Sequence, residues 1–195
     1  MLDGVLHGFF DLRGTTFVCS CLYSIMRYSR TTYLGILLGT VTWCSAIVLA
    51  PVLAAQGGMV ALPAEFIYRL FHPICHQLQE RSFTLLDQPF AACVRCSTIY
   101  FAFLAGALLY PVLRKIERPV MPSRVLLLAF ALPMLIDAFP IGLYEVTHLT
   151  RMITGGLFGF GLPFFILPAA IEAVQQMFAT PSTVSIQHQK GLTDA

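Results

Sequence analysis

Charged side chains are scarce in this chain, and four long stretches have almost none. Only 11% of the 195 residues are charged and the mean hydropathy is +0.75, whereas a soluble domain carries roughly 25% charged residues. This scarcity excludes an ordinary soluble protein and predicts an integral membrane protein in contact with the lipid bilayer. The stretches with at most one charge are residues 31–64, 96–113, 125–144 and 152–171.

The sequence also lacks the short motifs of several enzyme and binding classes. It contains no phosphate-binding loop, no nucleophile elbow and no zinc-protease helix. It has no basic patch of the kind that binds nucleic acid, and its net charge of +2 comes mainly from the loops predicted to face the cytoplasm. We therefore expect no nucleic-acid partner.

Each uncharged stretch is long enough to cross a membrane. A hydrocarbon core of about 30 Å needs about 20 helical residues at about 1.5 Å each. The sequence therefore predicts an all-α, four-helix transmembrane bundle within residues 31–178. Two glycine pairs, Gly35-x3-Gly39 and Gly155-x3-Gly159, have the spacing that lets membrane helices approach closely. The predicted spans are residues 33–55, 90–113, 125–144 and 152–171.

The two ends of the chain are expected outside the bundle. Residues 1–30 mix apolar and charged side chains, which predicts a cytoplasmic or interfacial segment. An alternative is that the true start codon lies near Met26, in front of Arg27 and Arg30. Residues 179–195 are polar and aperiodic, so we predict a disordered cytoplasmic tail.

Arginine and lysine are divided unevenly between the two sides of the predicted bundle. Eight of the 12 lie in the terminal segments and the loop 114–124, and four lie on the other side. By the positive-inside rule, both termini of this multi-pass protein are cytoplasmic, in the inner (plasma) membrane. The loop between the first two spans then faces outward, where a bacterium is oxidising.

Two clusters of cysteine and histidine lie on this outer side. The first is His72-Pro-Ile-Cys75-His76, and the second, Cys93-Val-Arg-Cys96, begins after 17 residues counted from Cys75. This spacing is close to that of the paired ligands of a structural zinc site. The turn formers Asp87, Gln88 and Pro89 let the chain fold back between the clusters. We predict a metal site, with five candidate ligands for four positions: His72, Cys75, His76, Cys93 and Cys96.

The loop that carries the first cluster has a helical pattern. Polar residues recur every three or four positions from Glu65 to Glu80, opposite apolar ones. The pattern predicts an amphipathic extracytoplasmic helix that Pro73 kinks or divides. His72, Cys75 and His76 would then share one face.

The same thiols suit a second chemistry. A Cys-x-x-Cys at a helix N-terminus beside Arg95 is typical of reactive thiols. Cys93 and Cys96, with Cys75 as a third thiol, can pass electrons to a quinone in the bilayer. Metal binding, with zinc first, is favoured because thiol exchange has no use for the histidines. The third interpretation is that these cysteines only pack as small apolar residues, as we expect for Cys44.

An acidic residue inside the third predicted span needs a partner. Asp137 lies 13 residues beyond Arg124, which places it about 20 Å along the helix, where an unpaired carboxylate costs several kcal/mol. Arg95 and Arg151 can both reach it, and we favour a structural pair between Asp137 and Arg151.

The alternative is a charged intramembrane pocket for a polar, anionic or lipid-like ligand. Tyr100 shares a face of the second span with both cysteines of the Cys-x-x-Cys. The pocket would be lined by Asp137, Arg151, Tyr100 and Thr154.

The motif-bearing residues resemble a known family. The runs are Cys75-His-Gln with Arg81-Ser-Phe, Cys93-Val-Arg-Cys96, Asp137, and Arg151-Met-Ile-Thr-Gly. They are similar to a family of small bacterial and archaeal integral membrane proteins catalogued only as a domain of unknown function, over roughly residues 66–160. The resemblance implies a membrane location and supplies no activity. It also implies that certain positions act together: Cys75, His76, Arg81, Cys93, Arg95, Cys96, Tyr100, Asp137 and Arg151.

The function expected from these features is an extracytoplasmic Cys/His metal site above a charged pocket. As an enzyme the protein would be a membrane oxidoreductase or a metal-assisted hydrolase of a lipid-linked substrate. Otherwise it would be a metal-stabilised structural subunit with a membrane-protein partner, or a small transporter. A closed four-ligand site favours the structural role, and an open position favours catalysis.

Overall fold

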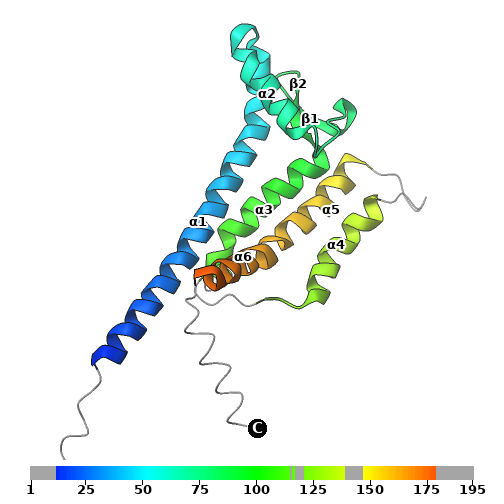
Figure 1. The fold of residues 1–195 in the computed structure, drawn as a ribbon. Coiled ribbons are helices and arrows are strands. Elements are labelled where there is room, and N and C mark those ends of the chain that lie inside the picture. Colours follow the sequence, from blue (N-terminus) through cyan, green and yellow to red (C-terminus); the bar gives the residue numbers. More distant parts are fainter. Residues whose placement is uncertain (1–11, 115, 117–120, 139–146, 179–195) are drawn as a thin grey trace, which may run out of the picture.

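The computed structural model is mostly helical and describes residues 12–114, 116, 121–138 and 147–178, with side-chain surroundings from Tyr28 onward (Figure 1). The helices are α1 (Leu12–Gln56), α2 (Leu62–Phe71), α3 (Val94–Leu113), α4 (Arg124–Ala138), α5 (His148–Gly161) and α6 (Pro163–Phe178), with 3-10 turns η1 (Gly58–Ala61) and η2 (Gln79–Arg81). The strands β1 (Ser82–Leu85) and β2 (Gln88–Cys93) form an antiparallel pair.

Three helical runs in the described part of the chain are long and apolar enough to cross a membrane. They are Tyr28–Gln56, Val94–Leu113 and His148–Met177. The last run combines α5 and α6, which meet at Leu162 because Pro163 has no backbone N–H to donate. The predicted span 125–144 is described only as the 15 residues of α4, since its outer part lies outside the described residues. The four-span bundle is therefore supported for three spans and stays a prediction for the fourth.

The ends of the chain are described only in part. Helix α1 begins at Leu12 and runs without a break into the first span, so residues 12–30 are helical. Residues 1–11 and the predicted tail 179–195 lie outside the described residues.

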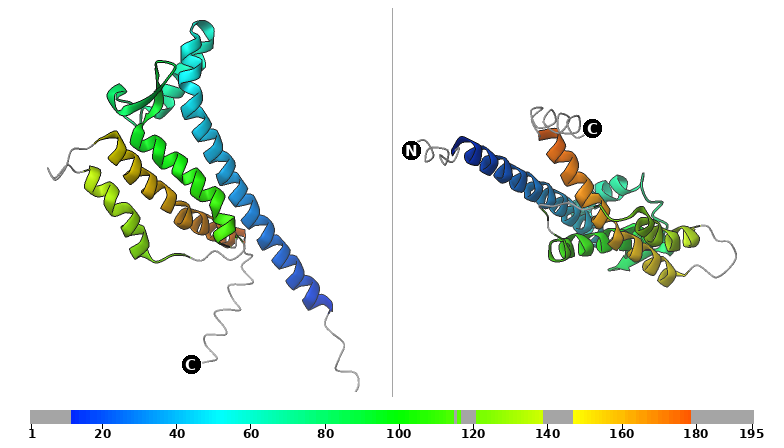
Figure 2. Two further views of the ribbon diagram at one scale, coloured as in Figure 1. Left: turned by 180° about the vertical axis from the view of Figure 1, so that it is seen from behind. Right: turned by 90° about the horizontal axis from the view of Figure 1, so that it is seen from below.

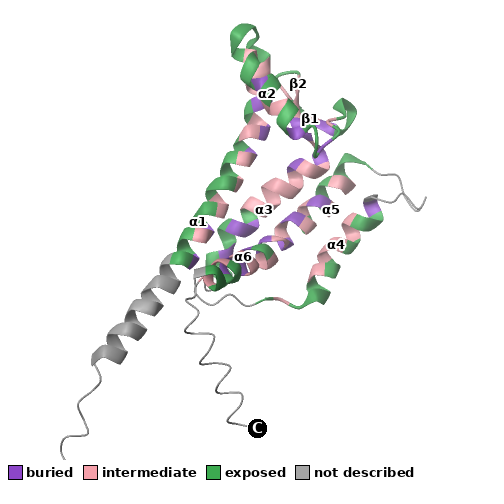
Figure 3. Ribbon diagram, in the orientation of Figure 1, coloured by how far each residue is buried: buried purple, intermediate pink, exposed green. Residues whose placement is uncertain are grey.

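Helix α3 lies at the centre of the arrangement. It packs between α1 and α5, while α4 packs against the far side of α5, and α6 returns to α1 (Figure 2). Tyr33 donates a hydrogen bond from α1 to the Ala107 carbonyl of α3 at 3.0 Å, and Gln175 of α6 donates to Ser29 at 2.8 Å. The helix faces that point away from these contacts are exposed (Figure 3), as expected for surfaces that lie against lipid.

Glycines set the distance between α3 and α5. A Cβ placed on Gly155 would lie 2.9 Å from the Thr98 hydroxyl, and one on Gly159 would lie 2.7 Å from the Ile99 Cα. The close approach predicted for the second glycine pair is therefore present. The first pair behaves differently, because a Cβ on Gly35 or Gly39 meets nothing within 4 Å.

The outer loop differs from the predicted helix. Helix α2 ends at Phe71, and the prediction of helix to residue 80 is wrong beyond it, because Pro73 cannot donate a helical hydrogen bond. The chain then forms the β1–β2 hairpin, so the fold is not entirely helical. Leu86 and Asp87 make its two-residue turn, both with positive φ (53° and 61°), which is the backbone that favours a tight antiparallel connection. Span two correspondingly begins at Val94, four residues later than predicted.

The glycine contact predicts a matched pair of substitutions. Gly159→Ala should lower the free energy of unfolding by about 1–3 kcal/mol, because the new methyl group pushes α3 and α5 apart. Gly156→Ala should leave it unchanged or raise it slightly, because a Cβ there meets nothing within 4 Å. Thermal unfolding in detergent measures both, and equal midpoints for the two variants would contradict the close approach.

Candidate metal centre

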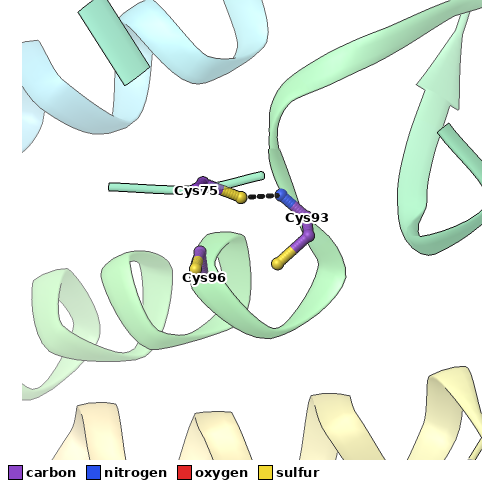
Figure 4. Close-up of side chains that lie close together, drawn as sticks. All are labelled: Cys75, Cys93 and Cys96. Carbon is purple, nitrogen blue, oxygen red and sulfur yellow. Dashed lines mark hydrogen bonds between the residues drawn. The ribbon is translucent and has the colours of Figure 1, made fainter. Parts of the chain in front are cut away.

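Three sulfur atoms converge at the N-terminal end of α3. Cys75 lies in the irregular segment after α2, Cys93 ends β2, and Cys96 is in the first turn of α3. All three sulfurs lie within 4.8 Å of one another (Figure 4). The predicted convergence of the two cysteine-bearing segments is therefore present in the structure.

The segment that carries Cys75 is held in place by a neighbouring amide. The side chain of Gln77 donates hydrogen bonds to the carbonyls of Tyr68 and Ala91, at 2.8 and 2.7 Å. Gln77 itself adopts a positive φ of 50°. Because one bond goes to α2 and the other to β2, Gln77 fixes Cys75 between these elements. The sequence analysis missed this role, although Gln77 lies within the Cys75-His-Gln run of the family resemblance.

Hydrogen-bond donors surround the sulfurs. The backbone N–H of Cys93 donates to the sulfur of Cys75 at 3.2 Å. A hydrogen bond from the Cys96 thiol has the largest effect on the pKa of Cys93 and lowers it. The N–H groups of Cys96 and Arg95 act in the same direction, whereas burial raises the pKa. The resulting pKa of Cys93 is about 5. The N-terminus of α3 adds a partial positive charge at the same place. At neutral pH this arrangement favours a thiolate at Cys93.

An aromatic and aliphatic wall encloses the inner side of the thiol cluster. Trp43 packs on Phe71 with ring centroids 4.5 Å apart and on Tyr100 at 5.9 Å. Cys75 is only 5% exposed and belongs to the same buried cluster as Ile47. Cys44 is also buried, but it donates to the Tyr100 carbonyl at 3.5 Å and lies outside the three-sulfur group. The thiols therefore face a dry environment on this side.

The two histidines lie apart from the sulfurs. His72 and His76 are both exposed, and the group of metal-binding atoms that the described residues bring together includes neither. The reason is the end of α2 at Phe71, which removes the helical face that His72, Cys75 and His76 were predicted to share. Their role as ligands stays a prediction.

A buried ion pair lies on the other side of the same helical turn. Arg95 of α3 pairs with Asp137 of α4, whose side chain is fully buried, and also donates to the Asp137 carbonyl at 3.1 Å. Thr154 of α5 donates to the Asp137 carboxylate at 3.4 Å. Among the described residues, the ion pair that we favoured, between Asp137 and Arg151, is not present. Arg151 is half-buried.

The remaining predicted site residues are more scattered. Tyr100 packs against the thiol cluster, whereas Arg81 is exposed in η2. Trp43 was not predicted to take part, although it is the only tryptophan of the chain. Its distance from the cysteines in sequence left no local signal for this contact.

Comparison with known proteins agrees with the family resemblance. Residues 75–165 match the model of a family described as "Predicted membrane protein (DUF2085)". The uncharacterized protein MJ1492 of Methanocaldococcus jannaschii is 32% identical over 151 residues, which are 75% of this chain and 97% of that protein. No solved structure matches. The matched region begins at Cys75 and includes all three converging cysteines and the Arg95–Asp137 pair.

The ion pair predicts a large effect of a single substitution. Asp137→Asn should lower the free energy of unfolding by about 3 kcal/mol, because it leaves the largely buried Arg95 guanidinium without its counter-charge. Glu65→Gln is the control, since the Glu65–Arg69 pair is solvent-exposed and its loss should cost about 0.5 kcal/mol or less. Chemical denaturation in detergent distinguishes the two, and similar small losses would refute a stabilising role for the buried pair.

Proposed function

The chain belongs to the DUF2085 family of predicted membrane proteins, and for this member we propose binding of one zinc ion by Cys75, Cys93 and Cys96 at the outer end of its membrane helices. The observation that carries the proposal is the convergence of three thiols from two segments of the chain. Thiolate sulfur is a preferred ligand of zinc, and the donors around Cys93 favour the deprotonated form that a metal requires.

The spacing of the sulfurs fits a zinc ion after a small contraction. Zinc–sulfur bonds of about 2.3 Å in a tetrahedron put neighbouring sulfurs about 3.8 Å apart. The three sulfurs lie within 4.8 Å of one another. Side-chain rotations that move the sulfurs by about 1 Å therefore suffice to reach the zinc spacing. Cys93 follows an extended strand and Cys96 a helical turn, and their side chains are free to make this adjustment without a change of fold.

Three thiolates leave a fourth position, which decides between two kinds of role. An open position bound by water would support metal-assisted catalysis, such as hydrolysis of a lipid-linked substrate. His72 or His76 would supply the fourth ligand if the turn after Phe71 brought its imidazole ring toward the sulfurs. Such a closed site would stabilise a structural subunit or small transporter. The exposed positions of both histidines favour the open form.

The placement of the site in the membrane follows from the charges. We propose that it faces the outer side of the inner membrane, with both termini in the cytoplasm, in accord with the distribution of Lys and Arg. Beneath it, Arg95, Asp137 and Thr154 tie together three helices, and we propose this group as the floor of the site. Arg81 and Arg151 stay candidates for contact with a polar or lipid-like ligand.

A second candidate function is thiol–disulfide exchange. The lowered pKa of Cys93 and the adjacent thiol of Cys96 favour this chemistry. Joining the Cys93 thiolate and the Cys96 thiol in a disulfide releases two electrons and one proton, and a membrane quinone that accepts them takes a second proton from water as it becomes a hydroquinone. Cys75 would then serve as the thiol that attacks the disulfide or a mixed-disulfide partner.

Metal analysis tests the zinc site. The purified protein should contain about one zinc per chain, and Cys93→Ser combined with Cys96→Ser should lose it, because a single thiolate holds zinc weakly. Cys44→Ser should retain the metal, since Cys44 lies outside the three-sulfur group. Elemental analysis of detergent-purified samples gives the result, and equal zinc in all three proteins would end the proposal.

Thiol alkylation of intact cells separates the two candidate functions. If zinc is bound, Cys93 and Cys96 should become alkylated only after a chelator is added. If they form a disulfide, they should become alkylated only after a reductant is added. Immediate alkylation without either reagent would contradict both functions, and Cys44 reports background labelling.

A further inference from the structure

A second feature of the membrane region lies beside the thiol cluster. A groove of about 410 Å³ opens between α1, α3 and α6, with a lining that is almost wholly apolar. Ile36 and Gly39 line it on α1, Phe103 on α3 and Ile166 on α6. All of these helices belong to candidate membrane spans, so the groove opens toward the hydrocarbon of the bilayer. Its volume falls in the range of small-molecule sites.

One end of the groove adjoins the buried cluster that contains Cys75. Trp43 and Tyr100 line the groove and also pack against the buried cluster that contains Cys75. Cys93 and Cys96 contact the same cluster. A ligand seated against the two rings would therefore lie against side chains that pack on the same cluster as the thiols.

The polar atoms at this end indicate the chemistry of the ligand. No charged side chain lines the groove, so an anionic phosphate or a cationic head group would lack a counter-charge in a medium of low dielectric. In the described part of the chain, the buried indole N–H of Trp43 lies near the Tyr100 hydroxyl but makes no well-formed hydrogen bond, and a buried donor left without a good acceptor costs about 1–3 kcal/mol. An uncharged carbonyl oxygen would satisfy it. The flat faces of Trp43 and Tyr100 also suit a planar ring.

We propose that the groove binds a membrane quinone, with its ring beside Trp43 and Tyr100 and its isoprenoid tail directed toward the lipid. Binding rests on the groove alone. The electron transfer rests on the second candidate function, to which the groove supplies the oxidant. In that step the Cys93 thiolate and the Cys96 thiol form a disulfide, and their two electrons, with the Cys96 proton and one proton from water, convert the quinone to the hydroquinone.

The only tryptophan of the chain provides the measurement. Trp43 is part of the proposed site, so intrinsic tryptophan fluorescence of the full-length protein in detergent reports on the groove alone. Titration with a short-tailed benzoquinone should give saturable quenching. Quenching that rises linearly without saturation would show collision only and would overturn the proposal.

Two glycines of α1 give a matched pair of variants. Gly39 lines the groove and Gly35 does not, while a Cβ at either meets nothing within 4 Å and both are exposed. Gly39→Leu should fill the groove and weaken binding at least about tenfold, equivalent to about 1.4 kcal/mol. Gly35→Leu should change it by less than about twofold. Equal quinone affinity of the two variants would overturn the placement of the quinone.

The same samples separate this inference from the proposed zinc site. Gly39→Leu should keep the zinc content of the unmodified protein, because Gly39 contacts none of the cysteines. Addition of the quinone to the reduced, metal-free protein should protect Cys93 and Cys96 from alkylation, and Gly39→Leu should slow this protection. Saturable binding without any protection of the thiols would overturn the role of the quinone as oxidant.

Discussion

The first turn of α3 is the constraint on which the rest of the site depends. The backbone N–H groups of a helix N-terminus have no partners within the helix and carry a partial positive charge. Here one such group follows an extended strand and donates to the sulfur of Cys75. The same turn presents Cys93 and Cys96 to one side and Arg95 to the other. The positions of the three sulfurs and of the buried charge pair thereby depend on one short segment, which the glycine contacts with α5 hold in place.

The fold was predictable where composition alone determines it. Uncharged runs identified α1, α3 and the α5–α6 run, because only a continuous helix satisfies its backbone within lipid. The hairpin was not predicted, since its turn consists of Leu86 and Asp87, and a leucine at positive φ carries no sequence signal. The helical pattern of polar and apolar residues from Glu65 to Glu80 continues through Pro73. Such a pattern does not show that the proline lacks the backbone N–H that a helix needs. The position of Cys75 depends on the long-range hydrogen bonds of Gln77, which no local pattern encodes.

The site was predicted in its thiols and less so in its other residues. The spacing of the motifs identified Cys75, Cys93 and Cys96. Two short paired motifs that are joined by turn-forming residues are expected to come close together in space. The histidines were included by the same spacing, and their approach to the sulfurs relied on a shared helical face, which the end of α2 removes. The sequence favoured Arg151 over Arg95 as the partner of Asp137, both near the N-terminal ends of their helices, and the structure pairs Asp137 with Arg95. Distance along each helix does not settle such a choice, since it depends on how α3 and α5 are rotated against each other.

The buried Arg95–Asp137 pair also affects how the turn of α3 that carries Cys93 and Cys96 is oriented. A charge pair removed from water gains little net stability over apolar residues of the same size, so stability alone does not account for Arg95 between two cysteines. Successive residues of a helix lie about 100° apart around its axis. The contact between Arg95 and Asp137 therefore fixes how α3 is turned about its own axis. The sulfurs of Cys93 and Cys96 lie on this turn within 4.8 Å of the sulfur of Cys75. Zinc coordination and disulfide formation would both need this proximity, and a pair that holds the orientation of α3 would help to maintain it.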